Sequence, residues 1–364
     1  MKRIAMAATA IAASAGAASA GGIDRSGQPL GPLFETGTYV EGSVALVSPS
    51  ISGVATAASP TPGGASGDMA PAYFQSTFGY KRDLRPDLAF ALLYDQPFGA
   101  DVEYPVAPYF ATGSTAQLDT HALTAVLKYR MPSNVSVYGG VRYQTMEATA
   151  SIPFVAGYTA TGERDGGVGY MVGAAYEKPE IALRIALTYN SRIQHDLVTT
   201  EAGPGALVST TTVKTPQSIN LDFQTGVAAD TLLFGSVRWV EWSKFDITPA
   251  VYLGATGGSL VSYANDTITY SIGLGRKLNE NWAVAGTLGY EPSHGGFSSN
   301  LGPTDGKTSI GVGATYTNGP VKITGGVSYT FIGDAQTTLG GGVAAANFTD
   351  NHALAAGVKI GYRF

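Results

Sequence analysis

The last residues of the chain alternate between two kinds of side chain with a period of two. One series is apolar and ends in aromatic residues: His352, Leu354, Ala356, Val358, Ile360, Tyr362 and Phe364. The intervening residues are small, apart from Lys359 and Arg363. Successive side chains of a strand point to opposite faces, so this segment predicts a strand with one apolar and one polar face. An apolar outer face and a polar inner face are typical of a strand in a transmembrane β-barrel.

The same period recurs along the chain. Apolar residues alternate with small or polar ones over 181–189, 218–227, 282–291 and 321–331. Placing an arginine at the lipid midplane of a barrel costs about 2–4 kcal/mol, so we expect Arg142 and Arg184 to face the lumen.

Composition excludes several classes of function. Charged residues make up 13% of the chain, and the acidic and basic residues are scattered, with a net charge of −5. A nucleic-acid partner is not expected, because binding one requires a clustered basic face. The absence of cysteine excludes disulfides, zinc–thiolate sites and thiol nucleophiles.

Residues 1–20 have the pattern of a secretory signal. Lys2 and Arg3 precede an uncharged run that ends in Ala18-Ser19-Ala20, a typical cleavage site. After Ala20 no apolar run reaches the ~18 residues that a transmembrane helix needs. We therefore expect an exported protein whose mature chain begins at Gly21, either a periplasmic β protein or an outer-membrane β-barrel. The alternation of side chains favours the barrel.

The predicted connections alternate between short and long. Six short turns are expected near 82–86, 131–134, 177–180, 228–230, 277–281 and 318–320, and seven long loops near 49–71, 97–113, 151–164, 195–211, 247–261, 292–305 and 333–349. These connections join fourteen antiparallel strands. Such barrels have short periplasmic turns and long outer loops, so both mature termini are expected in the periplasm. The predicted fold is thus an all-β transmembrane barrel over residues 36–364, preceded by a short segment, 21–35.

Two regions resemble a known family. Residues 33–41 (LFETGTYVE), continued by 48–53 (SPSISG), are similar to the first strand of the FadL-type outer-membrane transporters of long-chain fatty acids and hydrocarbons, the OMPP1/FadL/TodX group. Residues 215–221 (TPQSINL) and 238–243 (RWVEWS) are similar to that family's central pair of strands. The resemblance implies a fourteen-stranded barrel with an amino-terminal hatch. It also implies capture of a hydrophobic ligand by apolar outer loops, passive diffusion through an inner pocket, and lateral release beside a kinked strand.

The chain departs from this family at its start. Only residues 21–35 precede the barrel, and the Asn-Pro-Ala hatch motif of other members is absent. The hatch is therefore expected to be short, and the family's hatch contacts are not carried over. A barrel of this size needs something in its lumen if it is not to leak.

The candidate ligand-binding residues fall into two groups. Two outer loops are unusually apolar, and exposed apolar patches often mark binding sites, so we expect a capture groove. Its residues would be Phe98, Val102, Tyr104, Tyr109, Phe110, Phe154 and Tyr158. The alternative is that they pack on one another as a loop cap.

The second group is cationic and lumen-facing: Arg142, Arg184 and Arg238. One of them could bind a ligand carboxylate through a charge-assisted hydrogen bond. The alternative is pairing among lumen charges. Pro97, which cannot donate to a strand ladder, either opens the wall or begins a loop.

We expect no cofactor, no metal and no enzyme. The histidines lack metal-ligand spacing, and Ser293 and His294 are adjacent, which in a strand puts them on opposite faces. The expected partners are a long-chain fatty acid or other hydrophobic small molecule, outer-membrane lipid and lipopolysaccharide, with the protein a monomer. The alternatives are a general diffusion porin for polar solutes and a structural or adhesive barrel.

Overall fold

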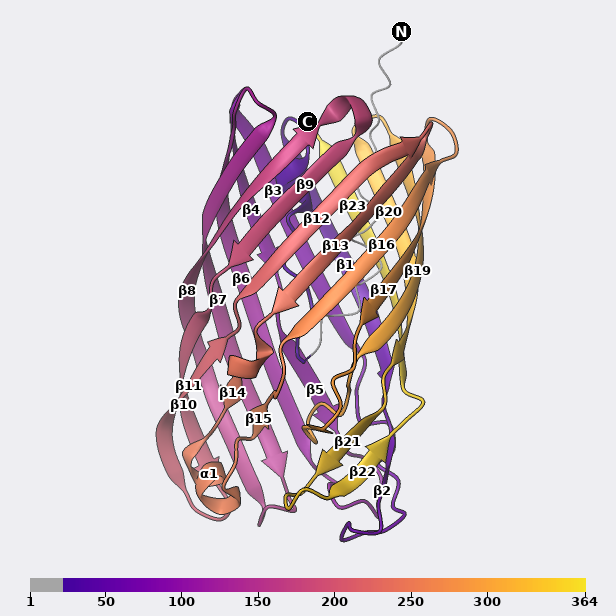
Figure 1. Ribbon diagram of the computed structural model, residues 1–364. Helices are drawn as coiled ribbons and strands as arrows, with labels where there is room; N and C mark the ends of the chain where they lie inside the picture. Colours follow the sequence, from indigo (N-terminus) through magenta and orange to yellow (C-terminus); the bar gives the residue numbers. More distant parts are fainter. Residues whose placement is uncertain (1–21) are drawn as a thin grey trace.

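The first and last strands of the chain pair with each other. Strand β1 (Tyr39–Ser50) runs antiparallel to β23 (His352–Arg363), with Tyr39 opposite Arg363 and Ser50 opposite His352. The sheet therefore closes on itself. The computed structural model, which describes residues 22–364, is a tall barrel of tilted antiparallel strands (Figure 1).

The wall contains 17 strand segments that form 14 crossings. Three crossings are interrupted, so that β4 continues as β5, β9 as β10, and β11 as β12. The remaining wall segments are β3 (Tyr73–Arg85), β4 (Leu88–Asp95), β5 (Gly99–Glu103), β6 (Thr115–Arg130), β7 (Val135–Ile152), β8 (Tyr158–Lys178), β9 (Leu183–Asn190), β10 (Ile193–Ala202), β11 (Leu207–Thr215), β12 (Ser218–Ala228), β13 (Thr231–Val240), β16 (Thr267–Lys277), β17 (Trp282–Glu291), β19 (Lys307–Asn318) and β20 (Val321–Ile332).

Side chains alternate between the two faces of the wall as the sequence predicts. In β23, Leu354 and Ile360 are each 53% exposed on the outside, whereas Ala355 and Lys359 are buried on the inside. Arg142 is also buried in the lumen. The outer face is thus apolar and the inner face polar, the arrangement that a lipid-facing barrel requires.

Exposed aromatic side chains lie near both ends of the outer face. Near the short turns these are Tyr129, Tyr176, Trp282, Tyr362 and Phe364; toward the other end they are Tyr143, Tyr170, Tyr270, Tyr290 and Phe331. Leucine, valine and isoleucine cover the surface between them. Two aromatic belts around an apolar band mark the two interfaces of a membrane.

The two ends of the barrel differ in their connections. The carboxyl terminus lies at the end with short turns, which we call the short-turn end (Figure 1). The opposite, long-loop end carries a small sheet of β2 (Gly53–Ala55), β18 (Phe297–Ser298), β21 (Ala335–Thr338) and β22 (Ala344–Phe348). The loop between β13 and β16 contains η4 (Trp242–Lys244), β14 (Asp246–Ile247), α1 (Ala250–Thr256) and β15 (Val261–Ser262). The remaining short helices are η2 (Gly31–Phe34) and η3 (Pro179–Ile181).

Several predicted loop boundaries were wrong. The loops expected near 151–164 and 195–211 are connections of residues 153–157 and 203–206, because β7, β8, β10 and β11 extend beyond the apolar band. Outside that band, outward-facing positions carry threonine and charged residues, so the strands lose the apolar signal that marked them. Residues 99–103 form β5, which pairs with β6, so the second loop begins at Tyr104. Val102 therefore belongs to the wall, Phe98 directly precedes β5, and Tyr158 begins β8.

The part of the chain described here has no helix long and apolar enough to cross a membrane. The expected signal sequence, residues 1–20, lies outside the described residues.

Candidate functional site

The amino-terminal segment, residues 22–35, lies inside the barrel and contacts its walls on two sides. On one side Arg238 of β13 donates to Asp24 at 2.7 Å, and Ser218 of β12 donates to Gln28 at 2.8 Å. On the other side Asp24 forms an isolated antiparallel bridge with Phe98. The segment therefore crosses the lumen from β12–β13 to the junction of β4 and β5.

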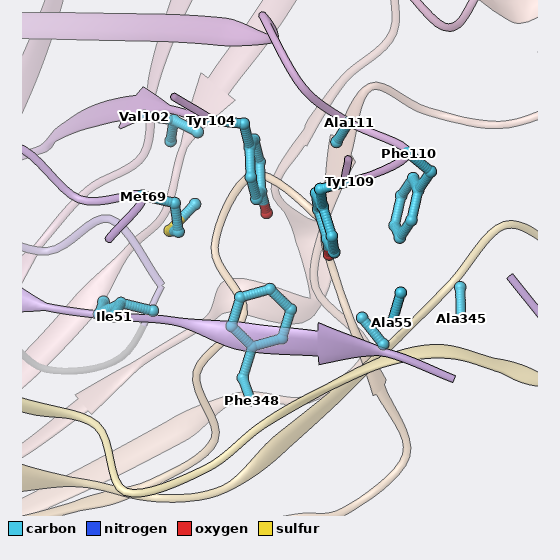
Figure 2. Close-up of a cluster of buried hydrophobic side chains, with 11 residues drawn as sticks. Ile51, Ala55, Met69, Val102, Tyr104, Tyr109, Phe110, Ala111, Ala345 and Phe348 are labelled. Carbon is cyan, nitrogen blue, oxygen red and sulfur yellow. The ribbon is translucent and has the colours of Figure 1, made fainter. Parts of the chain in front are cut away.

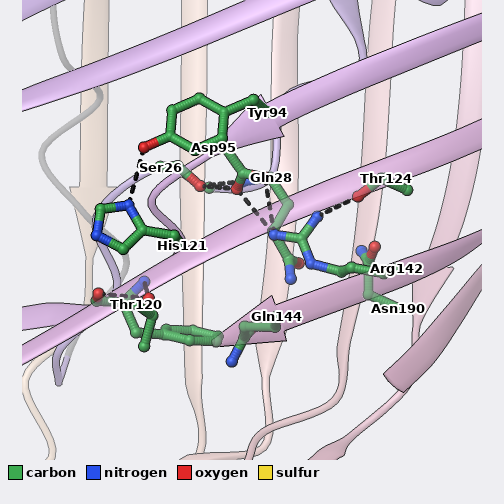
Figure 3. Close-up of polar contacts among 12 residues, drawn as sticks. Ser26, Gln28, Tyr94, Asp95, Thr120, His121, Thr124, Arg142, Gln144 and Asn190 are labelled. Atoms are coloured by element: carbon green, nitrogen blue, oxygen red, sulfur yellow. Dashed lines mark hydrogen bonds and ion pairs between the residues drawn. The ribbon is translucent and has the colours of Figure 1, made fainter. Parts of the chain in front are cut away.

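The segment is tied to the barrel wall by a buried charge network. Ser26 donates to Asp95 at 2.5 Å, and the same carboxylate accepts two hydrogen bonds from Arg142 at 2.8 and 2.9 Å (Figure 3). Arg142 also donates to Thr124 at 2.9 Å. Both ionic side chains are almost fully buried, so each charge depends on the other for compensation.

Toward the short-turn end the lumen is filled by packed side chains. Leu33 of η2 is buried among alanine, leucine and aromatic residues of β4, β6, β7 and β8. The ring of Phe34 lies 4.1 Å from Nζ of Lys128 and 4.5 Å from the guanidinium of Arg184, as ring-centroid distances. Tyr138 meets the same ring edge-on at 5.9 Å. These contacts place a plug between the lumen and the short-turn end.

The wall is interrupted where β4 turns into β5. Strand β3 pairs with β4 only from Phe78 onward, and its residues 73–77 pair with β1 alone. The amino-terminal segment fills this place: the backbone of Arg25 donates to the Pro97 carbonyl, and the Arg25 side chain pairs with Asp101 at 2.5 Å. The Arg25 guanidinium also lies 3.9 Å from the centroid of the Tyr73 ring. Pro97 thus marks a kink in the third crossing.

An apolar cavity of about 60 Å³ lies between the amino-terminal segment and the long-loop end. Its lining comes from six wall crossings and from the loop that carries β14 and β15, and it includes Ile23, Leu118, Leu197, Phe245 and Tyr263. Trp242, fully buried beside it, packs edge-to-face on Phe98 at 5.6 Å and on Phe245 at 5.5 Å. An apolar chamber inside the barrel offers a hydrophobic molecule an environment that a water-filled pore lacks.

A second and larger cavity, of about 280 Å³, adjoins Tyr263 from the opposite side. Its lining is mixed, with Gln75, Thr330 and the neighbouring Glu291 and Lys307 among apolar residues. Glu291 accepts a hydrogen bond from Thr269 at 2.7 Å and lies 3.8 Å from Lys307. Tyr263 therefore lines both cavities, one apolar and one of mixed polarity.

The outer loops form a packed cap. Tyr104, Tyr109 and Phe110 lie in a cluster with Met69 and Phe348, contributed by distant parts of the chain (Figure 2). Their rings stack in sequence, at 5.3 Å for the two tyrosines and 4.4 Å for Tyr109 and Phe110. Burial raises the pKa of the Tyr104 and Tyr109 hydroxyls, so both remain protonated.

The sequence-predicted loop residues therefore do not form one exposed groove. Of the candidates, Phe154 is exposed, at 40%, and meets Phe110 edge-on at 5.8 Å. Phe98 and Val102 face the lumen, and Val102 lines the apolar cavity. Tyr158 is buried and donates to Glu201, which also accepts from the first turn of α1.

The three predicted arginines all face the lumen, each with partners of its own. Arg142 pairs with Asp95, and Arg238 pairs with Asp24 while also donating to Asn220 at 2.6 Å. Arg184 lies against the ring of Phe34. In the structure Arg142 and Arg238 therefore pair with other lumen charges, which was the alternative to binding a ligand carboxylate.

Nothing among residues 22–364 gathers three or more potential metal-ligating side chains. The Tyr94 hydroxyl and Nδ1 of His121 share a hydrogen bond of 2.8 Å. His195 is buried, and its Nε2 atom lies 3.1 Å from the side-chain nitrogen of Gln144. Neither histidine adjoins a serine or threonine positioned as a nucleophile by the described hydrogen bonds.

The family model for outer membrane protein transport proteins of the OMPP1/FadL/TodX type matches residues 7–364. The chain belongs to this family. The family consists of non-enzymatic channels that carry hydrophobic compounds across the outer membrane, and the barrel found here is of that kind.

Solved structures support the fold over nearly the whole length. A FadL homologue of Pseudomonas aeruginosa has a TM-score of 0.73 at 16% identity, with 92% of each chain covered. The toluene transporter TodX of Pseudomonas putida has a TM-score of 0.67 at 13% identity, covering 92% of this chain and 91% of that one. The toluene transporter TbuX of Ralstonia pickettii has a TM-score of 0.61 at 13% identity, with the same coverage. The curated proteins include no match.

The FadL-type resemblance seen in the sequence is thus confirmed. Of the residues that line the apolar cavity, Val102 was among the candidates, but sequence reasoning missed Ile23, Leu197, Phe245 and Tyr263. Ile23 and Tyr263 lie in irregular segments without a two-residue period. The alternation around Leu197 was overlooked because its outward neighbours, such as Asp196, are polar.

Proposed function

We propose that this barrel takes up neutral hydrophobic small molecules and releases them sideways at the kink between β4 and β5. The supporting observation is the apolar cavity, which lies next to that interruption and is separated from the short-turn end by packed side chains. Both Ala100 and Val102 of β5 line the cavity. A molecule in it is therefore separated from the membrane by the wall beside the interruption, and from the aqueous space at the short-turn end by the amino-terminal segment and the side chains packed around it.

The direction follows from the general architecture of such barrels. Short turns lie in the periplasm and long loops outside, so the carboxyl terminus and the amino-terminal segment would be periplasmic. Phe154 and the cap that it adjoins would then face the exterior and meet the incoming ligand first. Lateral release delivers an apolar molecule to lipid, where it is more stable than in water.

The charges of the lumen favour a neutral ligand over a fatty acid. Five of the cations that surround the amino-terminal segment already have carboxylate partners: Arg25 with Asp101, Arg142 with Asp95, Arg238 with Asp24, Lys128 with Glu177 and Arg363 with Glu35. Arg184 lies instead against the ring of Phe34. A carboxylate bound at one of the five paired cations would have to displace its anion, and breaking a buried pair costs about 3–5 kcal/mol. A neutral molecule such as toluene can bind without breaking an ion pair.

The cavity must widen when a ligand enters. Its volume of about 60 Å³ is below the ~150 Å³ of a cavity known to admit benzene. Phe245 and Tyr263 come from a loop rather than from the wall, so a shift of this loop would enlarge the chamber without breaking ladder hydrogen bonds.

The test is binding of N-phenyl-1-naphthylamine, a neutral probe that fluoresces in apolar surroundings, by the purified protein and by two tryptophan variants of β6. Leu118→Trp fills the cavity and should abolish probe binding, whereas Leu127→Trp adds the same ring to the lipid face and should leave it intact. Dodecanoic acid should compete less well than dodecane. Equal binding by the two variants would refute the assigned pocket.

The same samples separate the proposal from a porin. In a planar bilayer the plugged barrel should show little steady conductance. Large conductance together with no probe binding would favour a diffusion porin, because an open aqueous path would then cross the lumen.

A further inference from the structure

We propose that the seam between β8 and β10 is a second lateral portal, through which the apolar cavity exchanges hydrophobic molecules with the outer membrane. This inference rests on the proposed function, since it assigns another route to the same cavity. It concerns a side of the barrel away from the β4–β5 kink.

The pairing of the wall is interrupted at this seam. Strand β8 pairs with β10 at Thr159–Gly162 and with β9 at Met171–Lys178, with no register between. Residues 163–170 of β8 thus face residues 191–198 without a regular ladder. The pairs on either side continue, because β7 still pairs with β8 up to Met146–Asp165 and β10 with β11 throughout.

Local contacts hold the seam closed in place of the ladder. The amide of Asp196 donates to the Asp165 carboxylate at 2.9 Å, and the amide of Tyr170 donates to the Ser191 hydroxyl at 2.9 Å. One backbone hydrogen bond, from the Ser191 amide to the Tyr170 carbonyl at 2.9 Å, closes the end of the seam nearer the short turns. Few bonds therefore have to break for the strands to separate here.

Glycines let an apolar side chain close the inner side. A Cβ at Gly167 would lie 2.4 Å from Cγ2 of Ile193, and one at Gly169 would lie 2.6 Å from Cγ1 of Ile193. Ile193, itself buried, therefore lies across the bare backbone of β8. Such a contact is dispersive, so it gives way at a lower cost than a hydrogen-bonded ladder in lipid.

The seam leads from the cavity to the outer face of the barrel at the edge of the apolar band. Leu197 and Gly162, at its end nearer the long loops, both line the apolar cavity. On the outside, Val168 is 68% exposed and Tyr170, in the aromatic belt, is 52% exposed, whereas Gln194 and Asp196 of β10 are exposed polar residues. His195, between Ile193 and Leu197 on the strand, is turned toward Gln144 of β7, at 3.1 Å.

The two interruptions of the wall differ in chemistry. The opening beside the β4–β5 kink is closed by the Arg25–Asp101 ion pair, whereas the inner side of the seam is closed by Ile193 and Leu197, and the Asp165 carboxylate that bonds the Asp196 amide is 36% exposed. A neutral apolar molecule passing the seam displaces aliphatic side chains and a few single hydrogen bonds, whereas at the kink it would have to separate an ion pair whose arginine is 8% exposed. The seam should therefore pass neutral ligands more readily than the kink.

A reversible crosslink tests this portal, because the chain has no cysteine of its own. The Ser191 hydroxyl lies 2.8 Å from the Cβ position at Gly169, close to the spacing of a disulfide, so the Gly169→Cys/Ser191→Cys variant should crosslink the seam. Because the added Cβ also displaces Ile193, the reduced form of this variant, and not the unmodified protein, is the reference for its entry rate. The matched control is Thr315→Cys/Thr324→Cys, a fully paired position where the two hydroxyls lie 2.9 Å apart. Both variants are reconstituted in phosphatidylcholine vesicles, and entry of N-phenyl-1-naphthylamine is followed by energy transfer from tryptophan.

Oxidation of the seam variant should slow probe entry about tenfold, equivalent to about 1.4 kcal/mol in activation free energy, without changing equilibrium binding. Reduction should restore the rate, and oxidation of the control should have no effect. A second variant, Ile193→Ala, should accelerate entry, whereas Ile185→Ala on the lipid face should not.

Two failures are distinguishable. Equal entry rates in the oxidised and reduced seam variant, or an unchanged rate in Ile193→Ala, would overturn the second portal while leaving the cavity as the binding site. Absence of probe binding in the unmodified protein would overturn the proposed function and the portal together.

Discussion

The ion pair between Asp24 and Arg238 offers the sharpest test of how the amino-terminal segment is held. Asp24 is 1% exposed and Arg238 is 7% exposed, and the Nε–Oδ2 distance is 2.7 Å. Substituting Asp24→Ala leaves the guanidinium buried without its anion. Removing one partner of a buried pair costs about 3–5 kcal/mol.

The structure places the expected loss at the lower end of that range. Arg238 keeps three neutral acceptors, because its Nη1 atom donates to Gln28 at 3.2 Å, Ser218 at 3.1 Å and Asn220 at 2.6 Å. A loss of about 3 kcal/mol corresponds to roughly a 100-fold change in an equilibrium constant. Since the pair joins the segment to the wall, this loss acts on the docking of the segment as well as on unfolding.

The assay is single-channel recording in planar bilayers, with urea unfolding in parallel. Asp24→Ala should raise the fraction of time spent in a conducting state and lower the unfolding free energy. Glu280→Ala, which removes a carboxylate from an exposed turn, should behave as the unmodified protein. The double variant Asp24→Ala/Arg238→Met should recover part of the stability, because it leaves no buried charge. Unchanged conductance and stability in Asp24→Ala would refute the assigned anchoring role.

Three further substitutions test the cavity, the cap and the facing of the wall. Tyr263→Ala should merge the two chambers and shift binding toward bulkier hydrophobic probes, measured as a change in the ratio of affinities for a naphthyl and an anthracenyl probe. Phe154→Ser should slow ligand capture with little loss of stability, whereas Tyr109→Ser should cost about 3 kcal/mol in urea unfolding because it empties a packed ring site. Leu187→Arg, on the lipid face, should hinder folding into vesicles by about 2–4 kcal/mol, more than Thr188→Arg, and the reverse ranking would contradict the facing of β9.

The barrel was predictable because each lipid-facing position has to be apolar. Leu354 and Ile360 are two such positions. The number of strands and the direction in which their side chains face could therefore be predicted from the sequence without knowing which residues are in contact. Where the strands leave the membrane, the requirement disappears. Glu147 and Arg164 pair across β7 and β8 outside the apolar band, and such polar residues resemble a loop when read alone.

The candidate site was less predictable because it depends on which side chains meet across the lumen. The alternation of side chains places Arg142 inside the barrel, but only the fold brings Asp95 of β4, on the far side of β6, to meet it. The same holds for Tyr104 and Phe348, which share one cluster although they are distant in the chain. Apolar character in a segment at the long-loop end therefore predicted burial as readily as ligand capture.

A barrel that releases its ligand sideways has to weaken its wall without exposing unpaired backbone to lipid. Ladder hydrogen bonds are costly to lose in a membrane, so an opening can lie only where other groups already replace them. At the kink this replacement comes from Arg25, whose backbone bonds the Pro97 carbonyl, and at the seam it comes from Asp165 and Ser191. Each of these hydrogen bonds is local, so a small movement of the backbone can break it and form another. The short amino-terminal segment can thus serve two needs at once: Phe34 closes the direct path, and Arg25 completes the wall beside the indirect one.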